Sequence, residues 1–342
     1  MGPYGVLSVA RHSKEIKLSI LKALQEIGEP AGAARIMERL LASGTALQPR
    51  TIRFYLLQMD REGLTRFVSR RIGRELTPRG RDEVAHANII EKVGFVASKI
   101  DDLGYRMTFS LGTGKGTIIT NIATIAKSYV PRALEDMKSV FTRGLSMGTK
   151  LVIAQEGERL GGFSVPPNMA AIGTVCSVTV NGIMLDEGIP VTSRFGGLLE
   201  LRDYKAVQFV ELIEYTGTTL DPLETFIQAD MTRVRDAARS GSGIIGASFR
   251  EIPSVATDDV IALKKKAERY GLSGILAIGH PNQPLFDIPV AEGCTGMVVV
   301  GGLNPIAALH ETGAGVAIQS LAGLEDFGRF QLFQELRDRF ST

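Results

Sequence analysis

Residues 49–62 read PRTIRFYLLQMDRE, and this stretch predicts the third helix of a small helical domain. Pro49 occupies a favoured first-turn position and Gly63 ends the helix. Working outward, residues 14–27 (KEIKLSILKALQEI) and 33–41 show the same helical spacing of apolar residues. The inward face of the third helix is expected to contain Ile52, Leu56, Leu57 and Met59.

A basic hairpin follows this helix. Residues 64–68 (LTRFV) are strand-like, residues 69–74 (SRRIGR) form a basic turn, and residues 75–77 form a short return strand. Three helices and a hairpin predict a winged helix-turn-helix over residues 12–80. Such a domain places its third helix in the DNA major groove and its wing on phosphate or the minor groove. The expected DNA contacts are Gln48, Arg50, Thr51 and Arg53 on the helix, and Arg70, Arg71 and Arg74 on the wing.

Charge is distributed unevenly along the chain. Residues 1–85 contain 15 Lys and Arg against 9 Asp and Glu, although the net charge of the whole chain is only +2. A basic N-terminal segment followed by a slightly acidic remainder indicates that only the N-terminal segment binds a polyanion. Two alternatives remain open at this point: the arginines are solvated surface, or the winged helix contacts protein.

The composition fits a globular protein without a membrane anchor. No apolar run in the 342 residues approaches the roughly 18 residues needed for a transmembrane helix. The first residues, MGPYGVLSVARHSKE, do not fit a secretory signal. Cys176 and Cys294 lie far apart and form no metal-ligand spacing. We expect reduced thiols, a cytoplasmic location and no contact with a membrane.

Residues 81–103 predict a linker helix. Ile89, Val93, Val96, Ile100 and Leu103 follow the 4, 3, 4, 3 spacing of a heptad seam. About two heptads are too few for an independent coiled coil, so packing on the next domain and a dimer contact are both open. Winged-helix repressors commonly pair on palindromic operators, which makes a homodimer the expected assembly.

The rest of the chain contains an internal repeat, at about 116–191 and 242–316. Each copy has a strand, a helix, a strand pair ending in a proline turn, and a glycine-led apolar strand (173–185 and 296–308). We therefore expect an α/β or α+β regulatory domain over residues 104–325, with mixed sheets and two similar lobes. In the later part of the repeat, Asn181 pairs with Asn304. Residues 192–240 join the lobes, and residues 326–342 form a C-terminal helix.

No catalytic or metal-binding constellation is apparent. The segment 112–117 (GTGKGT) departs from the phosphate-loop pattern because Phe109 stands at the position of its first glycine. The four histidines form no cluster with cysteine or acidic residues. We expect neither an enzyme nor a cofactor or metal.

Several turns in the duplicated domain are candidate ligand sites. Arg194 precedes Gly196 and Gly197, and Arg250 and Glu251 precede a proline. Arginine pairs bidentately with carboxylates, and glycine allows the backbone to approach a small anion. A structural Arg–Glu pair is the alternative for either arginine. The full effector-binding set is Cys176, Asn181, Arg194, Gly196, Gly197, Arg250, Glu251 and Asn304.

Long strings of the sequence resemble the NrpR family of nitrogen regulatory repressors. In the predicted winged helix these strings are PAGAARIMERL and PRTIRFYLLQMDREGLT, followed by the basic wing and LTPRG. In the predicted regulatory domain they include GTVCSVTVNGIMLDEGIPV, SRFGGLLEL, ELIEYTGTTLDPLETFI, ASFREIPS and VVVGGLNPIAALHETG. They occur in the same order and span residues 12–325.

The resemblance implies a dimeric repressor of nitrogen-assimilation genes that 2-oxoglutarate releases from double-stranded DNA. A dicarboxylate effector agrees with the arginines singled out above. Many members contain two regulatory domains, whereas this sequence contains one that is itself duplicated. The alternatives are a relative that senses another effector, a metabolite-converting enzyme with a regulatory winged helix, and a protein-interaction adaptor.

Overall fold

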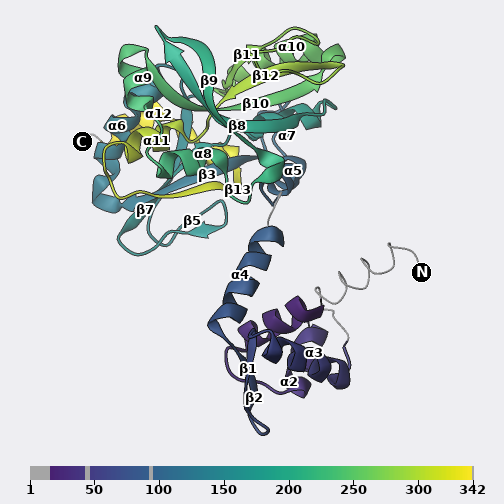
Figure 1. The fold of residues 1–342 in the computed structure, drawn as a ribbon. Helices are drawn as coiled ribbons and strands as arrows, with labels where there is room; N and C mark the ends of the chain where they lie inside the picture. The colour runs from purple at the N-terminus through teal and green to yellow at the C-terminus, as the bar shows by residue number, and fades with distance from the viewer. Residues whose placement is uncertain (1–15, 43–46, 92–94, 341–342) are drawn as a thin grey trace. The chain divides into compact units, whose positions relative to one another are not determined.

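The computed structural model describes residues 16–42, 47–91 and 95–340 (Figure 1). The chain divides into two compact units, Met1–Lys92 and Val93–Thr342. The boundary lies within the segment predicted as a linker helix.

The first unit is the predicted winged helix. A helix at 16–27 is followed by α2 (Ala33–Ala42), α3 (Pro49–Arg61), the antiparallel strands β1 (Thr65–Ser69) and β2 (Gly73–Leu76), and α4 (Pro78–Glu91). Residues 12–15 of the predicted domain lie outside the described residues. Apolar side chains of the three helices form one core, which includes Ile20, Leu24, Ile36, Leu40, Ile52 and Leu56.

The inward face of α3 differs from the prediction at one position. Ile52, Leu56 and Met59 are buried, but Leu57 is 53% exposed. Residues 52, 56 and 59 follow the i, i+4, i+7 spacing of one helical stripe. Leu57 lies about 100° around the helix from Leu56, so the prediction for Leu57 was wrong.

Asp60 at the end of α3 holds the wing. Its carboxylate accepts hydrogen bonds from Thr65 Oγ1 at 2.6 Å and from Arg74 Nε at 2.7 Å. Gly73 has φ +107°, and a Cβ there would lie 2.2 Å from the carbonyl of Ala31. The Asp60 bonds fix the hairpin relative to α3, and the close approach of Gly73 fixes it relative to the residues before α2.

The predicted heptad seam is divided between the two units. Helix α5 (Phe95–Arg106) begins the second unit, while Val93 and the side chain of Ile89 lie outside the described residues. Val96, Ile100 and Leu103 are buried within the second unit itself. These three residues therefore pack on their own domain and are not free to form a dimer seam.

The second unit contains two five-stranded sheets, which establishes the α+β form of the expected fold. One sheet has the order β13-β3-β7-β4-β14 and the other β11-β12-β10-β8-β9. All strand pairs within the described residues are antiparallel, in place of the mixed sheets expected. The first sheet contains β3 (Thr117–Ala126), β4 (Lys150–Ala154), β7 (Met169–Val175), β13 (Ala317–Asp326) and β14 (Gln331–Leu332); the second contains β8 (Thr192–Arg202), β9 (Lys205–Glu214), β10 (Gly243–Pro253), β11 (Ile275–Ile278) and β12 (Cys294–Val300).

Helices pack between and around these sheets. They are α6 (Val130–Thr142), α7 (Thr179–Asp186), α8 (Pro222–Gln228), α9 (Val234–Ser240), α10 (Thr257–Glu268), α11 (Asn304–His310) and α12 (Phe333–Phe340), with a small hairpin of β5 (Arg159–Leu160) and β6 (Phe163–Ser164). The predicted C-terminal helix begins later than expected, at Phe333, whose ring stacks on Phe141 at 4.5 Å. Throughout the described ranges, each helix is too short or too polar to span a bilayer.

The repeat is a β-α-β-β-α-β unit whose last strand changes lobe. Strand β8 closes the first repeat but pairs with β10 of the second, and β13 closes the second repeat but pairs with β3 of the first. The predicted apolar strands 173–185 and 296–308 are instead the end of a strand followed by a helix, α7 or α11. Helices α7 and α11 are short and apolar, and they lack the polar face whose spacing would indicate a helix in the sequence.

Asn181 and Asn304 do not occupy equivalent positions, so this part of the repeat alignment was wrong. Asn304 is the first residue of α11, and Thr179 is the first of α7. The Thr179 hydroxyl hydrogen bonds to the main chain of Ile119, and the Asn304 amide does the same at Gly246. Thr179 is therefore the equivalent of Asn304.

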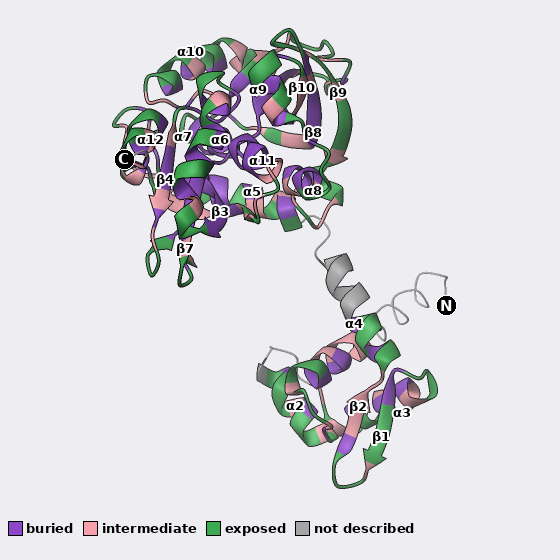
Figure 2. Cartoon of the chain, turned by 90° about the vertical axis from the view of Figure 1, so that its left-hand side faces the viewer, coloured by how far each residue is buried: buried purple, intermediate pink, exposed green. Residues whose placement is uncertain are grey.

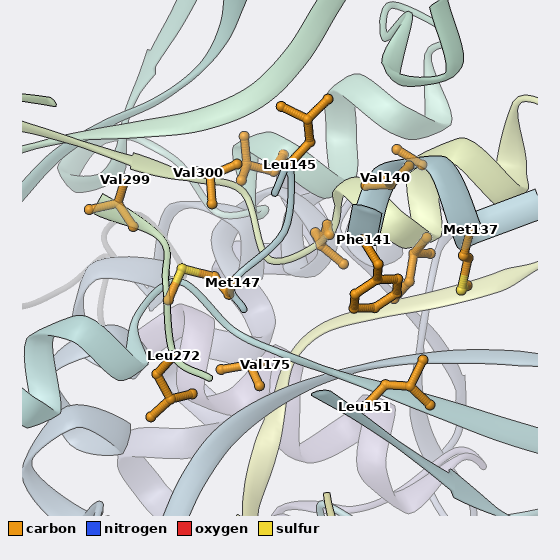
Figure 3. Close-up of a cluster of buried hydrophobic side chains, with 14 of the residues drawn as sticks. Met137, Val140, Phe141, Leu145, Met147, Leu151, Val175, Leu272, Val299 and Val300 are labelled. Carbon is orange, nitrogen blue, oxygen red and sulfur yellow. The ribbon is translucent and has the colours of Figure 1, made fainter. Parts of the chain in front are cut away.

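The two lobes share one hydrophobic core. Met147 and Val175 of the first lobe lie beside Leu272 and Val299 of the second, in one cluster with side chains of α6 and β4 (Figure 3). Strand β10 is buried along most of its length, whereas the edge strand β9 is largely exposed (Figure 2). Neither lobe has a separate core.

Replacing Asn304 with alanine tests the contact between α11 and β10 that established the corrected repeat. Asn304 is 1% exposed and bonds to both the N–H and the C=O of Gly246, at 2.9 and 3.0 Å. We expect Asn304→Ala to lower the free energy of unfolding by about 1–3 kcal/mol, because buried polar groups lose their partner. Urea unfolding followed by circular dichroism measures the change. The exposed-site control Gln283→Ala should stay within about 0.5 kcal/mol of the wild type, and equal midpoints for both variants would contradict the assignment.

Candidate DNA-binding surface and effector site

The four residues predicted to read DNA lie together at the start of α3. Gln48 precedes the helix with extended backbone and makes no side-chain capping bond. Gln48, Arg50 and Arg53 are exposed, and Thr51 is half-buried. Neither arginine forms an ion pair within the described residues. The helix terminus therefore presents two unneutralised guanidinium groups to solvent.

The wing arginines divide into two kinds. Arg70 and Arg71 are exposed in the turn between β1 and β2. Arg74 lies on β2 instead, where its side chain is 16% exposed, pairs with Asp60 and covers the ring of Phe67 at 5.1 Å. Arg74 thus holds the wing, while Arg70 and Arg71 remain available to a ligand.

A buried guanidinium is the principal feature of the second unit. Arg250 on β10 is 1% exposed. Its Nη1 donates to Asn181 Oδ1, and its Nη2 donates to Ser248 Oγ at 3.3 Å. Asn181 in turn donates to Ser193 Oγ at 3.0 Å. The Nε of Arg250 is buried without a partner, and no carboxylate of the described ranges pairs with the guanidinium.

Burial perturbs the titration of the surrounding groups. It lowers the pKa of Arg250 to about 10 and raises that of the Cys176 thiol to about 12. Burial likewise raises the pKa of the Tyr215 phenol. Asp221, at the start of α8, has its pKa raised to about 6 by burial, although helix N–H groups and Lys99 oppose the shift. Near neutral pH the thiol and phenol are therefore uncharged, and Arg250 carries a buried positive charge.

Other predicted site residues have structural partners. Arg194 pairs with Glu251 at 2.7 Å, and Glu251 also accepts the N–H of Ala291 at 3.0 Å. Asn304 binds the main chain, as described above. A Cβ at Gly197 would lie 2.5 Å from the carbonyl oxygen of Glu211 in the adjacent strand. Of the predicted set, Cys176 and Asn181 lie beside Arg250, whereas Arg194 and Glu251 pair with each other.

Gly196 lies against the same cluster. A Cβ there would be 3.0 Å from the Tyr215 hydroxyl. Tyr215, Asp221, Ser193 and Ser248 were not predicted as site residues. The sequence could have identified Ser248 as a site residue, because it lies two residues before Arg250 and therefore on the same face of the strand. Tyr215 and Asp221 come from the segment between the repeats and gave no local signal.

A pocket of about 240 Å³ opens beside this cluster. Its lining includes Asp221 and Glu224 of the α8 region, Lys99 of α5, and Gln319 and Ser320 of β13. Asp221 both lines the pocket and interacts electrostatically with Cys176 and Tyr215. The pocket therefore borders the buried polar cluster. No group of acidic, histidine or cysteine side chains in the described part of the chain could hold a metal ion.

Helix α5 packs directly on the cluster. Its buried residues share a small hydrophobic core with Cys176, Tyr215 and Leu321. Gly104 of α5 lies so near α7 that a Cβ there would be 3.9 Å from the Cβ of Asn181. The first helix after the unit boundary thus contacts the residues around Arg250.

Comparison with known proteins identifies both units. Residues 93–331 match the family model "NrpR regulatory domains NRD1 and 2", and residues 18–84 match "Ribonuclease R winged-helix domain". The chain is 34% identical over 310 residues to the global nitrogen regulator NrpRI of Methanosarcina mazei, covering 91% of this chain and 95% of that protein. It is 29% identical to the global nitrogen regulator NrpR of Methanococcus maripaludis, covering 92% of this chain but 55% of that protein.

A solved structure shares the fold over about two thirds of this chain. The crystal structure of a nitrogen repressor-like protein from Methanococcus jannaschii superposes with a TM-score of 0.59 at 28% identity, over 69% of this chain and 97% of that one. The curated relatives are named as regulators, and the matching models are a regulatory domain and a winged helix. The chain is accordingly a regulator with a winged-helix domain rather than an enzyme. It belongs to the NrpR family, which the sequence motifs had indicated.

Proposed function

We propose that this protein is a homodimeric repressor of nitrogen-assimilation genes, and that 2-oxoglutarate releases it from its operator. The exposed arginines on α3 and the wing support DNA binding, and the names of the relatives support the class of genes. Two winged helices in a dimer would read the half-sites of a palindromic operator. Cys176 and Cys294 are both free, which agrees with a cytoplasmic location.

The unpaired Arg250 is the observation on which the effector assignment rests. A buried cation without a counter-ion is costly, and a carboxylate placed against it would supply both charge and hydrogen bonds. The free Nε lies in a cluster formed by α7 of one lobe and β10 of the other. An anionic ligand bound there would alter the contact between the lobes. A dicarboxylate is the ligand class that this site favours, with Lys99 in the adjoining pocket as a second cation.

Helix α5 would transmit the change. It contacts Cys176 and Tyr215 in the effector cluster, and it is the first helix after the winged-helix unit in the sequence. A ligand shifts this equilibrium only by its different affinity for the two states. A coupling of about 1–3 kcal/mol would change operator affinity roughly 5- to 150-fold.

Operator binding with and without 2-oxoglutarate tests the proposal as a whole. Genomic fragments from upstream of nitrogen-assimilation genes are titrated with the full chain at fixed salt. We expect one or more fragments to bind selectively and to be released by millimolar 2-oxoglutarate. Selective binding that ignores 2-oxoglutarate would contradict the effector assignment alone, whereas equal binding of all fragments would contradict the DNA-binding function.

Arginine substitutions on α3 test the recognition surface. We expect Arg50→Ala and Arg53→Ala each to weaken operator binding by about 1–3 kcal/mol, because each removes a cation that contacts a base or phosphate. The matched control is Arg269→Ala, an exposed arginine of the regulatory unit, which should bind as the wild type does. Unchanged affinity in both α3 variants would show that α3 is not the recognition helix.

Arg250→Gln tests the effector site. Glutamine removes the charge but keeps a hydrogen-bonding amide, so we expect normal operator binding and at least a roughly tenfold higher 2-oxoglutarate concentration for release. Arg194→Gln is the control, since it breaks the nearby pair with Glu251 and leaves the cluster intact. Circular dichroism verifies that both variants fold. A wild-type response in Arg250→Gln, or an equal loss in Arg194→Gln, would remove Arg250 from the effector site.

The raised pKa of Asp221 predicts a pH dependence. Below its pKa of about 6 the carboxyl group is neutral, and above that value it carries a negative charge beside the cluster. Because the ligand is an anion, its affinity should fall as pH rises through this range. Arg250, whose pKa of about 10 lies well above this range, stays positive and adds no step. Calorimetric titrations at several pH values should show the fall in the wild type and a flat profile in Asp221→Asn, which can still cap α8. Parallel profiles would contradict the assignment.

A further inference from the structure

The outward face of α3 is both basic and apolar. Opposite the buried stripe of Ile52, Leu56 and Met59, the helix exposes Phe54 at 56% and Leu57 at 53%. Three exposed arginines, Arg50, Arg53 and Arg61, flank these two side chains. Figure 2 shows the exposed side of α3 in green and the buried side in purple.

Nothing within the described residues covers this apolar surface. The ring of Phe54 contacts that of its neighbour Tyr55, edge to face at 5.3 Å. The three arginines form no ion pair with the described residues. An exposed Phe–Leu pair ringed by free cations is costly in water, and a contiguous feature of this kind indicates a binding surface. The ligand must offer negative charge around small apolar contacts.

The major groove of DNA has this combination. Phosphates line the groove, and the thymine C5-methyl group is the apolar contact that a base pair presents there, which phenylalanine side chains can recognise. A second copy of the chain fits less well, because it would bring the same arginines against one another. Charge complementarity therefore selects DNA as the occupant.

We propose that Phe54, assisted by Leu57, contacts thymine methyl groups in the major groove and so determines a preference for thymine at one or two positions of each half-site. Arg50 and Arg53 read guanine edges or phosphates on either side. The inference rests on the proposed DNA-binding function and adds a base preference to it. Arg61, one turn after Leu57, extends the basic border toward the end of the helix.

Replacing thymine with deoxyuridine removes the methyl group alone and tests the inference. Sequences selected by the full chain from a random pool first define the thymines of the preferred site. Each is then changed to deoxyuridine, and affinities are measured at fixed salt. We expect a loss of about three- to tenfold at one or two thymines per half-site, since one buried methyl group contributes about that much.

The variants identify the side chain responsible. Phe54→Ala should bind the thymine-containing site more weakly than the wild type does. Its affinity should show no further loss when those thymines are replaced with deoxyuridine. Phe67→Ala, which removes an exposed aromatic ring from the wing, is the control and should keep the full deoxyuridine effect. The dependence of affinity on salt should stay unchanged in Phe54→Ala, whereas Arg50→Ala should reduce its slope.

The other outcomes are distinct. Selective binding by the wild type without any deoxyuridine effect overturns the thymine contact and leaves DNA binding in place. A deoxyuridine effect that persists in Phe54→Ala assigns the methyl contact to another residue and also overturns the inference. If no sequence is selected, and Phe54→Ala converts a dimer to a monomer in sedimentation, the face is a protein interface and both proposals fail.

Discussion

The regulatory unit depends on the exchange of one strand between its two repeats. Strand β8 follows the first repeat but lies beside β10, and β13 follows the second repeat but lies beside β3. Each sheet is therefore incomplete without a strand from the other half, and the lobes cannot separate without breaking main-chain hydrogen bonds. The shared core reinforces this link. A ligand between the lobes can shift their contact only by small amounts, which is the condition for a switch with two packed states.

The same exchange creates the proposed effector site. It brings α7 of one half against β10 of the other, so that Asn181 meets Arg250 in a region sealed from water. The low dielectric of this buried region raises the free energy of the Arg250 charge and strengthens its attraction for an anion. Helix α5 packs on Cys176 and Tyr215, so in our proposal the first helix of the regulatory unit would respond when that charge is compensated. The buried charge, its hydrogen-bond partner Asn181 and the contact with α5 therefore lie in one cluster.

The features predicted correctly from the sequence are those with a local cause. Three helices, a basic hairpin and a duplicated α+β domain follow from periodicity, turn residues and repeated strings. The errors arose where the helical phase was misjudged, where a buried helix has no polar face, or where partners distant in sequence decide the outcome. Leu57 was assigned to the core although only its neighbour Leu56 belongs to the stripe, and two apolar helices, α7 and α11, were taken for strands. Arg194 and Arg250 look alike in sequence, but only the folded chain shows that Arg194 has Glu251 and Arg250 has no carboxylate.

The corrected repeat explains why a duplicated domain contains one such cluster. The N–H groups of Cys176 and Gly301 both bond, at 2.8 Å, to the carbonyls of Ile119 and Gly246 respectively, which makes these two pairs equivalent. Counting along the strands from them, Ser248 corresponds to Asn121 and Arg250 to Ala123, while Asn181 corresponds to Ile306. The second position therefore lacks the guanidinium, its amide partner and the thiol, and Asn121 instead accepts the N–H of Leu321 at 3.1 Å. The scaffold is present twice, but the buried guanidinium is present on one side only, so the proposed effector would bind at one position per chain.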